Sequence, residues 1–181
     1  MDIREKKTKR SIKNAFLQLR ASKPLEKITI KELSTLAEIS KATFYLHYKD
    51  IYDLSDTLEK EVIQLVLNDI KKPDIIFSDV RQFINELALA FYSQTNIIEI
   101  LFSGSQQSIL PICIEKELKQ YIFQIKPELK DDIKFNIALS YQIQGSYYAF
   151  SENHKQFGAN YVLSTLSELH TPLFNVKKTE T

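Results

Sequence analysis

The stretch TIKELSTLAEISKATFYLHYKD, residues 29–50, carries the local signals that decide the fold of this 181-residue chain. Thr29 followed three residues later by Glu32 is a capping box, which marks the start of a short helix. Ser40 is a second N-cap residue after a brief connection, and Asp50 is a third. The stretch therefore predicts two short helices joined by a tight turn, with a longer helix after them.

Helical periodicity continues on both sides of this stretch. Ile12, Ala15, Phe16 and Leu19 share one apolar stripe of an N-terminal helix. Apolar residues recur at helical spacing after residue 50, and no segment has the alternation of a strand. Pro127 stands in the favoured first-turn position of a further helix. The sequence predicts an all-α fold of about nine helices, over residues 8–21, 30–37, 41–48, 51–72, 80–91, 97–102, 114–125, 127–151 and 159–170.

Two short helices joined by about three residues, the second one separately capped, are the signature of a helix-turn-helix. The run Lys71-Lys72-Pro73-Asp74 closes the long helix that follows and is the best candidate for a domain boundary. We therefore expect a helix-turn-helix DNA-binding domain over residues 1–50, a connecting helix over 51–72, and a helical regulatory and dimerisation domain over 73–181.

Composition argues against several classes of protein. The single cysteine, Cys113, has apolar neighbours and cannot form an internal disulfide framework, which favours a reducing compartment. The three histidines are scattered, so we predict no metal and no cofactor. The charged amino terminus lacks the apolar core of a secretory signal, and no apolar run reaches the roughly 18 residues of a membrane span. We expect a soluble cytoplasmic protein without a membrane partner.

No recognisable catalytic constellation is present in the sequence. The pattern of residues contains no nucleophile with a base beside it, no carboxylate dyad, no cluster of metal ligands and no glycine-rich loop of the kind that binds phosphate. The sequence therefore predicts that the chain is not an enzyme.

The net charge of +1 hides an asymmetry along the chain. Residues 1–50 carry 12 Lys and Arg against 6 Asp and Glu, a local charge of +6, whereas residues 51–181 carry 12 against 17, a charge of −5. A basic head on an acidic body indicates a polyanionic partner that meets the head alone. A solvated lysine-rich face is the alternative that charge by itself leaves open.

The second short helix is expected to have one buried and one exposed face. With Ser40 as its cap, Phe44 and Tyr48 fall four residues apart and should face inward. Small side chains let a backbone approach DNA closely, and lysine, threonine and tyrosine donate hydrogen bonds to phosphates or base edges. We interpret the outer face as a surface that enters the major groove of DNA. The residues off the inner face are Lys41, Ala42, Thr43, Tyr45 and Leu46.

These residues resemble the TetR-type (TetR/AcrR) transcriptional regulators, whose recognition helix follows the pattern S-K-G-T-hydrophobic-Y-x-H-F. The chain has SKATFYLHY at residues 40–48, followed by Asp50 and Leu54. The family's pattern for the preceding helix is matched over residues 29–34, with Ser34 in the usual alanine position. The match covers residues 8–58. The resemblance implies a DNA-binding head on a larger helical body that dimerises and binds a small ligand.

The chain departs from the family pattern at three positions. Ala42 replaces the usual glycine, and Ile51 and Tyr52 replace a lysine and a glutamate at the start of the next helix. The missing lysine commonly meets a DNA phosphate in the family. We expect Lys49 to supply that charge instead, because it stands beside a helix N-terminus that itself favours phosphate.

The resemblance and the chemistry of the side chains together predict a set of DNA contacts. Lys41 and Thr43 are expected at or near base edges, and the remaining polar members of the set at phosphates. Two alternatives stay open at this point: His47 caps or packs only, or Tyr45 is half-buried. The predicted DNA-binding residues are Thr29, Lys31, Ser40, Lys41, Ala42, Thr43, Tyr45, His47 and Lys49.

The regulatory domain offers weaker signals. Helices around 133–151 and 159–170 are the predicted dimer interface, because the first is too apolar for a surface helix; a central position in the domain is the alternative. Residues 141–150 resemble the penultimate helix of one branch of the family, in which a small residue such as Gly145 permits close packing. Candidate effector-pocket residues are aromatic or polar groups on apolar helices, for which a tyrosine-rich core is the commoner explanation. They are Tyr92, Phe102, Tyr121, Tyr141 and Gln142.

Two functional hypotheses follow. The first is a DNA-binding repressor that binds a palindromic operator as a homodimer and is released by a small-molecule effector, since one small helix-turn-helix reads too few base pairs for selectivity. The alternative is a helical protein-interaction module whose basic head binds an acidic partner protein.

Overall fold

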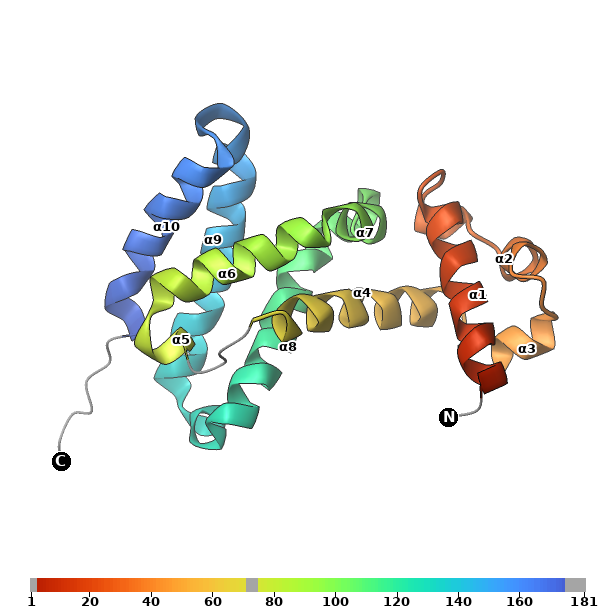
Figure 1. Cartoon of the computed structure of the whole chain (residues 1–181), viewed down its shortest axis with the longest axis horizontal. Coiled ribbons are helices and arrows are strands. Elements are labelled where there is room, and N and C mark those ends of the chain that lie inside the picture. Colours follow the sequence, from red (N-terminus) through yellow and green to blue (C-terminus); the bar gives the residue numbers. More distant parts are fainter. Residues whose placement is uncertain (1–2, 71–74, 175–181) are drawn as a thin grey trace. The chain divides into compact units, whose positions relative to one another are not determined.

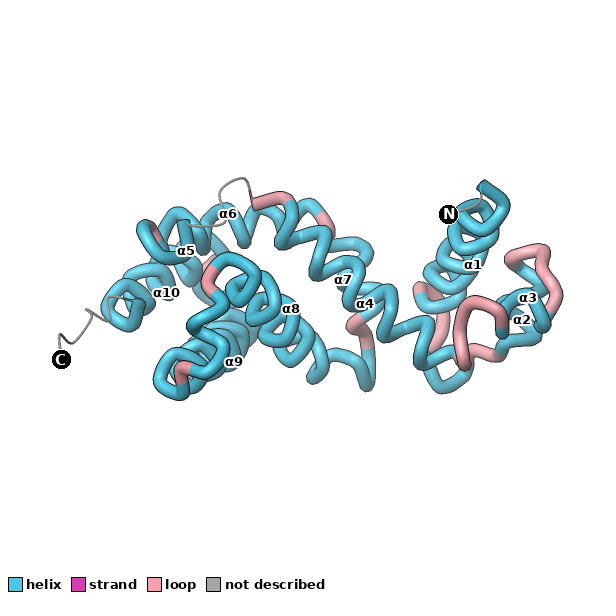
Figure 2. The backbone as a smooth tube through the Cα atoms, turned by 90° about the horizontal axis from the view of Figure 1, so that it is seen from below, coloured by secondary structure: helices cyan, strands magenta, loops and turns pink. Residues whose placement is uncertain are grey.

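A computed structural model describes residues 3–70 and 75–174, and this part of the chain is all-α, without strands (Figure 2). It contains ten α-helices. The helix that was not among the nine expected ones is the short segment Ile75–Ser78, which the apolar periodicity of the sequence does not predict. The helices are α1 (Ile3–Arg20), α2 (Ile30–Leu36), α3 (Lys41–Tyr45), α4 (Ile51–Asn68), α5 (Ile75–Ser78), α6 (Val80–Ser93), α7 (Thr95–Leu101), α8 (Leu110–Ile125), α9 (Ile133–Phe157) and α10 (Ala159–Phe174) (Figure 1).

Several expected helix bounds differ from those of the structure, among them the end of the helix expected over 41–48, which closes at Tyr45. The first helix begins at Ile3 rather than near residue 8, and the Glu5–Lys9 ion pair of 3.0 Å supports the additional turn. Another difference concerns Pro127, which lies in a separate 3-10 turn, Pro127–Asp131. Helix α9 starts only at Ile133, because the Asp132 carboxylate accepts the Phe135 N–H at 2.9 Å and so caps it there.

Helix α9 also continues beyond the expected end near residue 151. Its last turn contains His154 and Lys155, whose side chains suit the negative end of the helix dipole. The helix ends at Phe157, where Gly158 takes φ 85° and its N–H donates to the carbonyl of His154. The end of α9 is therefore set by the glycine rather than by a loss of apolar residues.

By packing, the described residues form two compact units. Unit 1 comprises the residues up to Val62 together with Thr95–Leu110, and unit 2 comprises Ile63–Gln94 together with the residues from Pro111 onward. The boundary expected at residues 71–74 lies outside the described residues. The division by packing instead falls within α4, and it assigns α7 to the same unit as the N-terminal helices.

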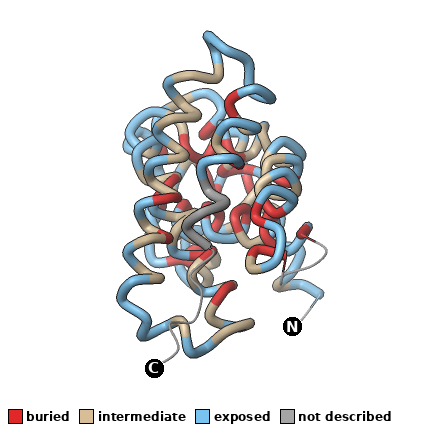
Figure 3. The backbone as a smooth tube through the Cα atoms, turned by 90° about the vertical axis from the view of Figure 1, so that its left-hand side faces the viewer, coloured by how far each residue is buried: buried red, intermediate tan, exposed pale blue. Residues whose placement is uncertain are grey.

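The core of unit 1 is built from the apolar stripes that the sequence predicts. Ile12, Ala15, Phe16 and Leu19 of α1 are all buried, as their spacing indicates, and Figure 3 marks such positions in red. Side chains from α2, α3 and α4 complete this core. Those with almost no exposed surface are Leu33, Phe44, Leu54 and Leu58.

A buried arginine connects α1 to the segment after α7. The guanidinium of Arg20 donates to the carbonyl oxygens of Leu101 at 3.0 Å and Ser103 at 3.2 Å, and to that of Lys23 at 3.1 Å. The Leu101 carbonyl is the last one of α7 and has no partner inside its own helix. Arg20 explains why residues 95–110, although distant in sequence, belong to unit 1.

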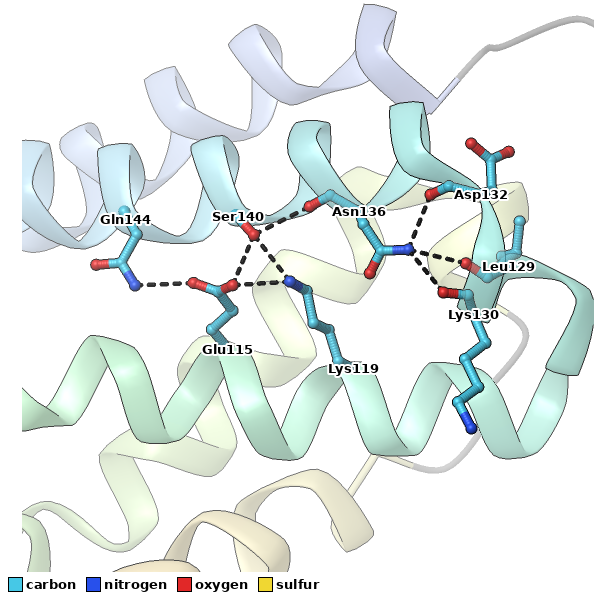
Figure 4. Close-up of polar contacts among 8 residues, drawn as sticks. All are labelled: Glu115, Lys119, Leu129, Lys130, Asp132, Asn136, Ser140 and Gln144. Atoms are coloured by element: carbon cyan, nitrogen blue, oxygen red, sulfur yellow. Dashed lines mark hydrogen bonds and ion pairs between the residues drawn. The ribbon is translucent and has the colours of Figure 1, made fainter.

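In unit 2, a polar cluster joins α8 to α9 (Figure 4). The Glu115 carboxylate accepts from Lys119 Nζ at 2.8 Å, Ser140 Oγ at 2.6 Å and Gln144 Nε2 at 2.9 Å. Burial alone would raise the pKa of Glu115, but the bonds from Gln144, Lys119 and Ser140 and the charge of Lys119 outweigh it and lower the pKa to about 2. Glu115 is therefore ionised at neutral pH and fixes the register of the two helices.

Within the described residues, no single helix is long and apolar enough to cross a membrane. Only the bent pair Thr95–Leu101 and Gly104–Ile125 reaches that length and apolarity, and only when the two segments are taken together. In the same part of the chain, no three His, Cys, Asp or Glu side chains are grouped so that they could hold a metal ion.

Candidate nucleic-acid interface

Helix α2 is fixed by the cap that the sequence predicts. The side chain of Thr29 accepts the N–H of Glu32 at 3.2 Å, and Ile28 and Leu33, on either side of the cap, are both buried. The Glu32 carboxylate pairs with Lys23 Nζ at 2.6 Å, which connects the start of α2 to the end of α1. The exposed side of α2 therefore begins with Thr29 and Lys31, both of which remain at the surface.

The turn between α2 and α3 is a Schellman motif. Glu38 N–H donates to the carbonyl of Thr35 at 3.2 Å, and Ile39 N–H donates to that of Ser34 at 3.0 Å. The motif places Glu38 in the left-handed region with φ 56°. Glycine is the usual residue at such a position. Because the chain has Glu38 there instead, no glycine marks this turn in the sequence, and only the caps on either side of the turn predicted it.

Helix α3 begins where Ser40 caps it. Ser40 Oγ accepts the Thr43 N–H at 3.0 Å and shares a further hydrogen bond of 2.9 Å with Thr43 Oγ1. Phe44 and Tyr48 point into the core of unit 1, with ring centroids 5.8 Å apart. The predicted inner face is confirmed, and the short helix is held at its start by a cap and along one side by two aromatic rings.

The opposite side of α3 faces solvent. Lys41 and Ala42 are exposed, and Tyr45 is 57% exposed while its ring packs edge-on against Phe44 at 5.7 Å. Tyr45 is therefore more than half exposed, while its contact with Phe44 holds the ring in place. Leu46 is 81% exposed, the larger fraction of the two. Its helical position predicts that Leu46 lies off the inner face, but Leu46 is not among the predicted DNA contacts.

His47 stands at the edge of this surface and is partly buried. Its ring lies 6.4 Å from that of Tyr48, centroid to centroid. His47 therefore has a packing neighbour and an exposed edge at once.

Unit 1 contains two kinds of lysine near this surface. In the part of the chain that the structure describes, the ammonium groups of Lys31, Lys41 and Lys49 have no ion-pair partner, and all three side chains are exposed. Their charges are available to an external anion. Other lysines of the unit are neutralised by carboxylates: Lys9 by Glu5, Lys13 by Glu61 and Lys23 by Glu32.

The start of α4 explains the departure at position 51. Asp50 Oδ1 accepts the Asp53 N–H at 2.8 Å, and Asp53 Oδ2 accepts the Lys49 N–H at 2.9 Å. This double cap turns Ile51 into the core, where it is 6% exposed, while the Lys49 side chain remains outside. A lysine at position 51 would be buried in this arrangement, so the nearest exposed cation is Lys49.

The five candidate pocket residues are divided between the two units. Phe102 is buried in unit 1, whereas Tyr92 of α6, Tyr121 of α8, and Tyr141 and Gln142 of α9 belong to unit 2. Tyr92 and Tyr141 have most of their surface exposed, and Tyr121 is partly buried. Gln142 is buried, and its Nε2 has no hydrogen-bond partner among the described residues, which makes it the strongest polar candidate of the five.

In comparisons with known proteins, no protein-family model matches the chain and no curated protein matches it at a significant level.

Proposed function

We propose that the chain is a sequence-specific DNA-binding transcriptional regulator of the TetR type, acting as a repressor on a palindromic operator. The observation that carries this proposal is the solvent side of α3. It presents the exposed Lys41 and Tyr45 and the partly exposed Thr43 from a helix that is capped at its start and anchored on its inner side. A short, braced helix with such a face fits a major groove about 12 Å wide.

The charge distribution supports a nucleic acid as the partner. The unpaired ammonium groups of Lys31 in α2, Lys41 in α3 and Lys49 in the turn before α4 belong to a head with a charge of +6. Thr29, Ser40 and the edge of His47 add hydroxyl and imidazole groups beside them. Cations and hydroxyls distributed in this way suit the phosphates of two DNA strands, on either side of the groove that α3 enters.

Dimerisation through α9 and α10 forms the second part of the proposal. Four of the exposed large apolar residues of α9 follow one stripe: Ile133, Ile137, Tyr141 and Tyr148. Gly145 lies on the same stripe, and a Cβ at this position would meet no atom within 4 Å apart from its chain neighbours and the adjoining backbone of α9. A helical glycine destabilises its own helix, so an open glycine between apolar residues supports the close approach of a second copy.

Release by a small-molecule effector is the third part of the proposal. The buried amide of Gln142 lies on α9 within the apolar packing of unit 2 and has an unused donor in the described part of the chain. An effector that accepts a hydrogen bond from the Gln142 amide stabilises the arrangement of the helical body in which that bond forms. If that arrangement misfits the operator, the affinity for DNA falls by the difference in binding energy.

The proposed DNA surface is tested by a gel shift on the duplex upstream of the chain's own reading frame. We expect Lys41→Ala/Tyr45→Ala to lose at least about tenfold in affinity, because each base or phosphate contact contributes about 1–3 kcal/mol. A matched control removes the same residue types from exposed positions of unit 2, Lys116→Ala/Tyr92→Ala, and should bind like wild type. Equal affinity of the α3 double variant and wild type would overturn the assignment of α3.

A further inference from the structure

The middle of the solvent side of α3 is apolar. Successive residues of an α-helix are 100° apart, so a residue two positions after Phe44 lies on the opposite side of the helix from it. That residue is Leu46, and Ala42 precedes it by one turn. Leu46 keeps helical dihedral angles (φ −68°, ψ −23°), and its N–H donates to the Ala42 carbonyl at 3.2 Å, so the two side chains continue one stripe.

Polar and cationic groups surround this apolar stripe. Lys41 and Tyr45 flank it on one side, and the exposed Lys49 follows it in the chain. A partner that fits must combine a small apolar group at its centre with negative charges on its rim. A hydrophobic protein groove would leave Lys31, Lys41 and Lys49 without anions, whereas duplex DNA supplies phosphates on both rims of its major groove.

The major groove also contains one apolar group, the C5-methyl of thymine. We propose that Leu46, with Ala42 beside it, is a specificity-determining residue that contacts thymine methyl groups, so that the operator has a required thymine at a fixed position of each half-site. This inference rests on the proposed DNA-binding function and deepens it. Lys41 and Thr43 supply polar contacts to the neighbouring bases, whereas Leu46 distinguishes thymine from bases that lack the methyl group.

The inference is tested by replacing thymine with deoxyuridine, which removes the methyl group and keeps the base-pairing groups. Wild type first selects its preferred duplex from a random library, and each thymine of that duplex is then replaced in both half-sites in turn. We expect one replacement to weaken wild-type binding by about fourfold per methyl group, hence about 16-fold for two symmetrical half-sites. The Leu46→Ala variant should bind the thymine and deoxyuridine duplexes equally well.

Two further variants complete the experiment. Leu46→Met keeps an apolar side chain and should retain the preference for thymine, whereas Leu36→Ala removes an exposed leucine of α2 and should leave the preference unchanged. The inference is overturned if wild type binds its selected duplex with no dependence on any thymine methyl, or if Leu46→Ala keeps the full dependence. A wild type that enriches no duplex would instead refute the proposed function and the inference with it.

Discussion

Glu38 is the one non-glycine residue with a positive φ in the described part of the chain, and it stands at the turn that orients α3. The Schellman hydrogen bonds of Thr35 and Ser34 over-determine this conformation, so the turn forms despite an unfavourable residue. A left-handed conformation costs an L-residue with a Cβ roughly 1–2 kcal/mol. The orientation of α3 is therefore imposed by the caps and the core rather than by the residue in the turn.

Replacing Glu38 tests whether its left-handed conformation strains the turn. We expect Glu38→Gly to raise the free energy of unfolding by about 1 kcal/mol, because glycine adopts the left-handed region without strain. For a chain of this length the gain corresponds to a rise in Tm of about 2–4 °C by calorimetry. Glu38→Ala keeps the Cβ and should gain nothing. Equal stabilities of the two variants would show that the turn is unstrained.

At the scale of the element, the helices of unit 1 are set by local signals and could be predicted. Thr29, Ser40 and Asp50 each bond to a backbone N–H three residues later, so their positions in the sequence are enough to start α2, α3 and α4. The start of α9 at Asp132 was missed because Pro127 gave a competing local signal. Capping residues therefore predicted the starts of these helices, whereas the position of the proline gave a wrong start for α9.

Contacts between distant elements could not be predicted from spacing. Arg20 looks like one more surface cation of a basic head, yet its guanidinium is buried against carbonyls 81 and 83 residues away in the sequence. Leu46 was missed for a different reason, since an exposed leucine suggests no polar chemistry although its helical position is clear from the sequence. The polar residues of the candidate interface could be predicted from their side-chain types. Its apolar centre, Leu46, became apparent only from the exposed fraction of that side chain in the structure.

The polar cluster between α8 and α9 gives a pH-dependent prediction. The folded-state pKa of Glu115 is lowered to about 2, so its stabilisation is present above the ordinary glutamate pKa and is lost as pH falls toward 2. We expect Glu115→Gln to lower the free energy of unfolding by about 2 kcal/mol at pH 7, because three donors lose their anionic acceptor. Urea titrations at several pH values should show this gap closing as pH falls below about 4.5.

A control at an exposed position separates this cluster from general charge effects. Glu152→Gln removes a surface carboxylate of the same helix, α9, and should change stability by less than about 0.5 kcal/mol at every pH. If Glu115→Gln is as stable as wild type at pH 7, or if its deficit persists unchanged at low pH, the cluster does not hold α8 and α9 together.

A palindromic operator requires two copies of the chain, one for each half-site. The apolar stripe of α9 is the surface proposed to join them, so a charge at its centre should separate them. We expect Ile137→Glu to convert a dimer to a monomer in light scattering coupled to size-exclusion chromatography, since an ionised carboxylate cannot be buried unpaired. Ile112→Glu, an equally exposed apolar position of α8, should leave the dimer intact.

The same pair of variants connects assembly to function. A monomeric Ile137→Glu protein that keeps its helical content should lose most of its affinity for a palindromic duplex, because only a two-fold pair reads both half-sites. A wild type that is monomeric at micromolar concentration, or an Ile137→Glu variant that remains dimeric, would contradict the assignment of the α9 stripe.

The central claim is that α3 reads DNA, and selection from a random duplex library at about 0.15 M salt tests it most directly. Wild type should enrich a palindrome, and Lys41→Ala/Tyr45→Ala should enrich none, whereas Lys116→Ala/Tyr92→Ala should enrich the wild-type sequence. If wild type binds all duplexes alike and enriches no sequence, the head does not read DNA, and an acidic protein becomes the better partner for its lysines.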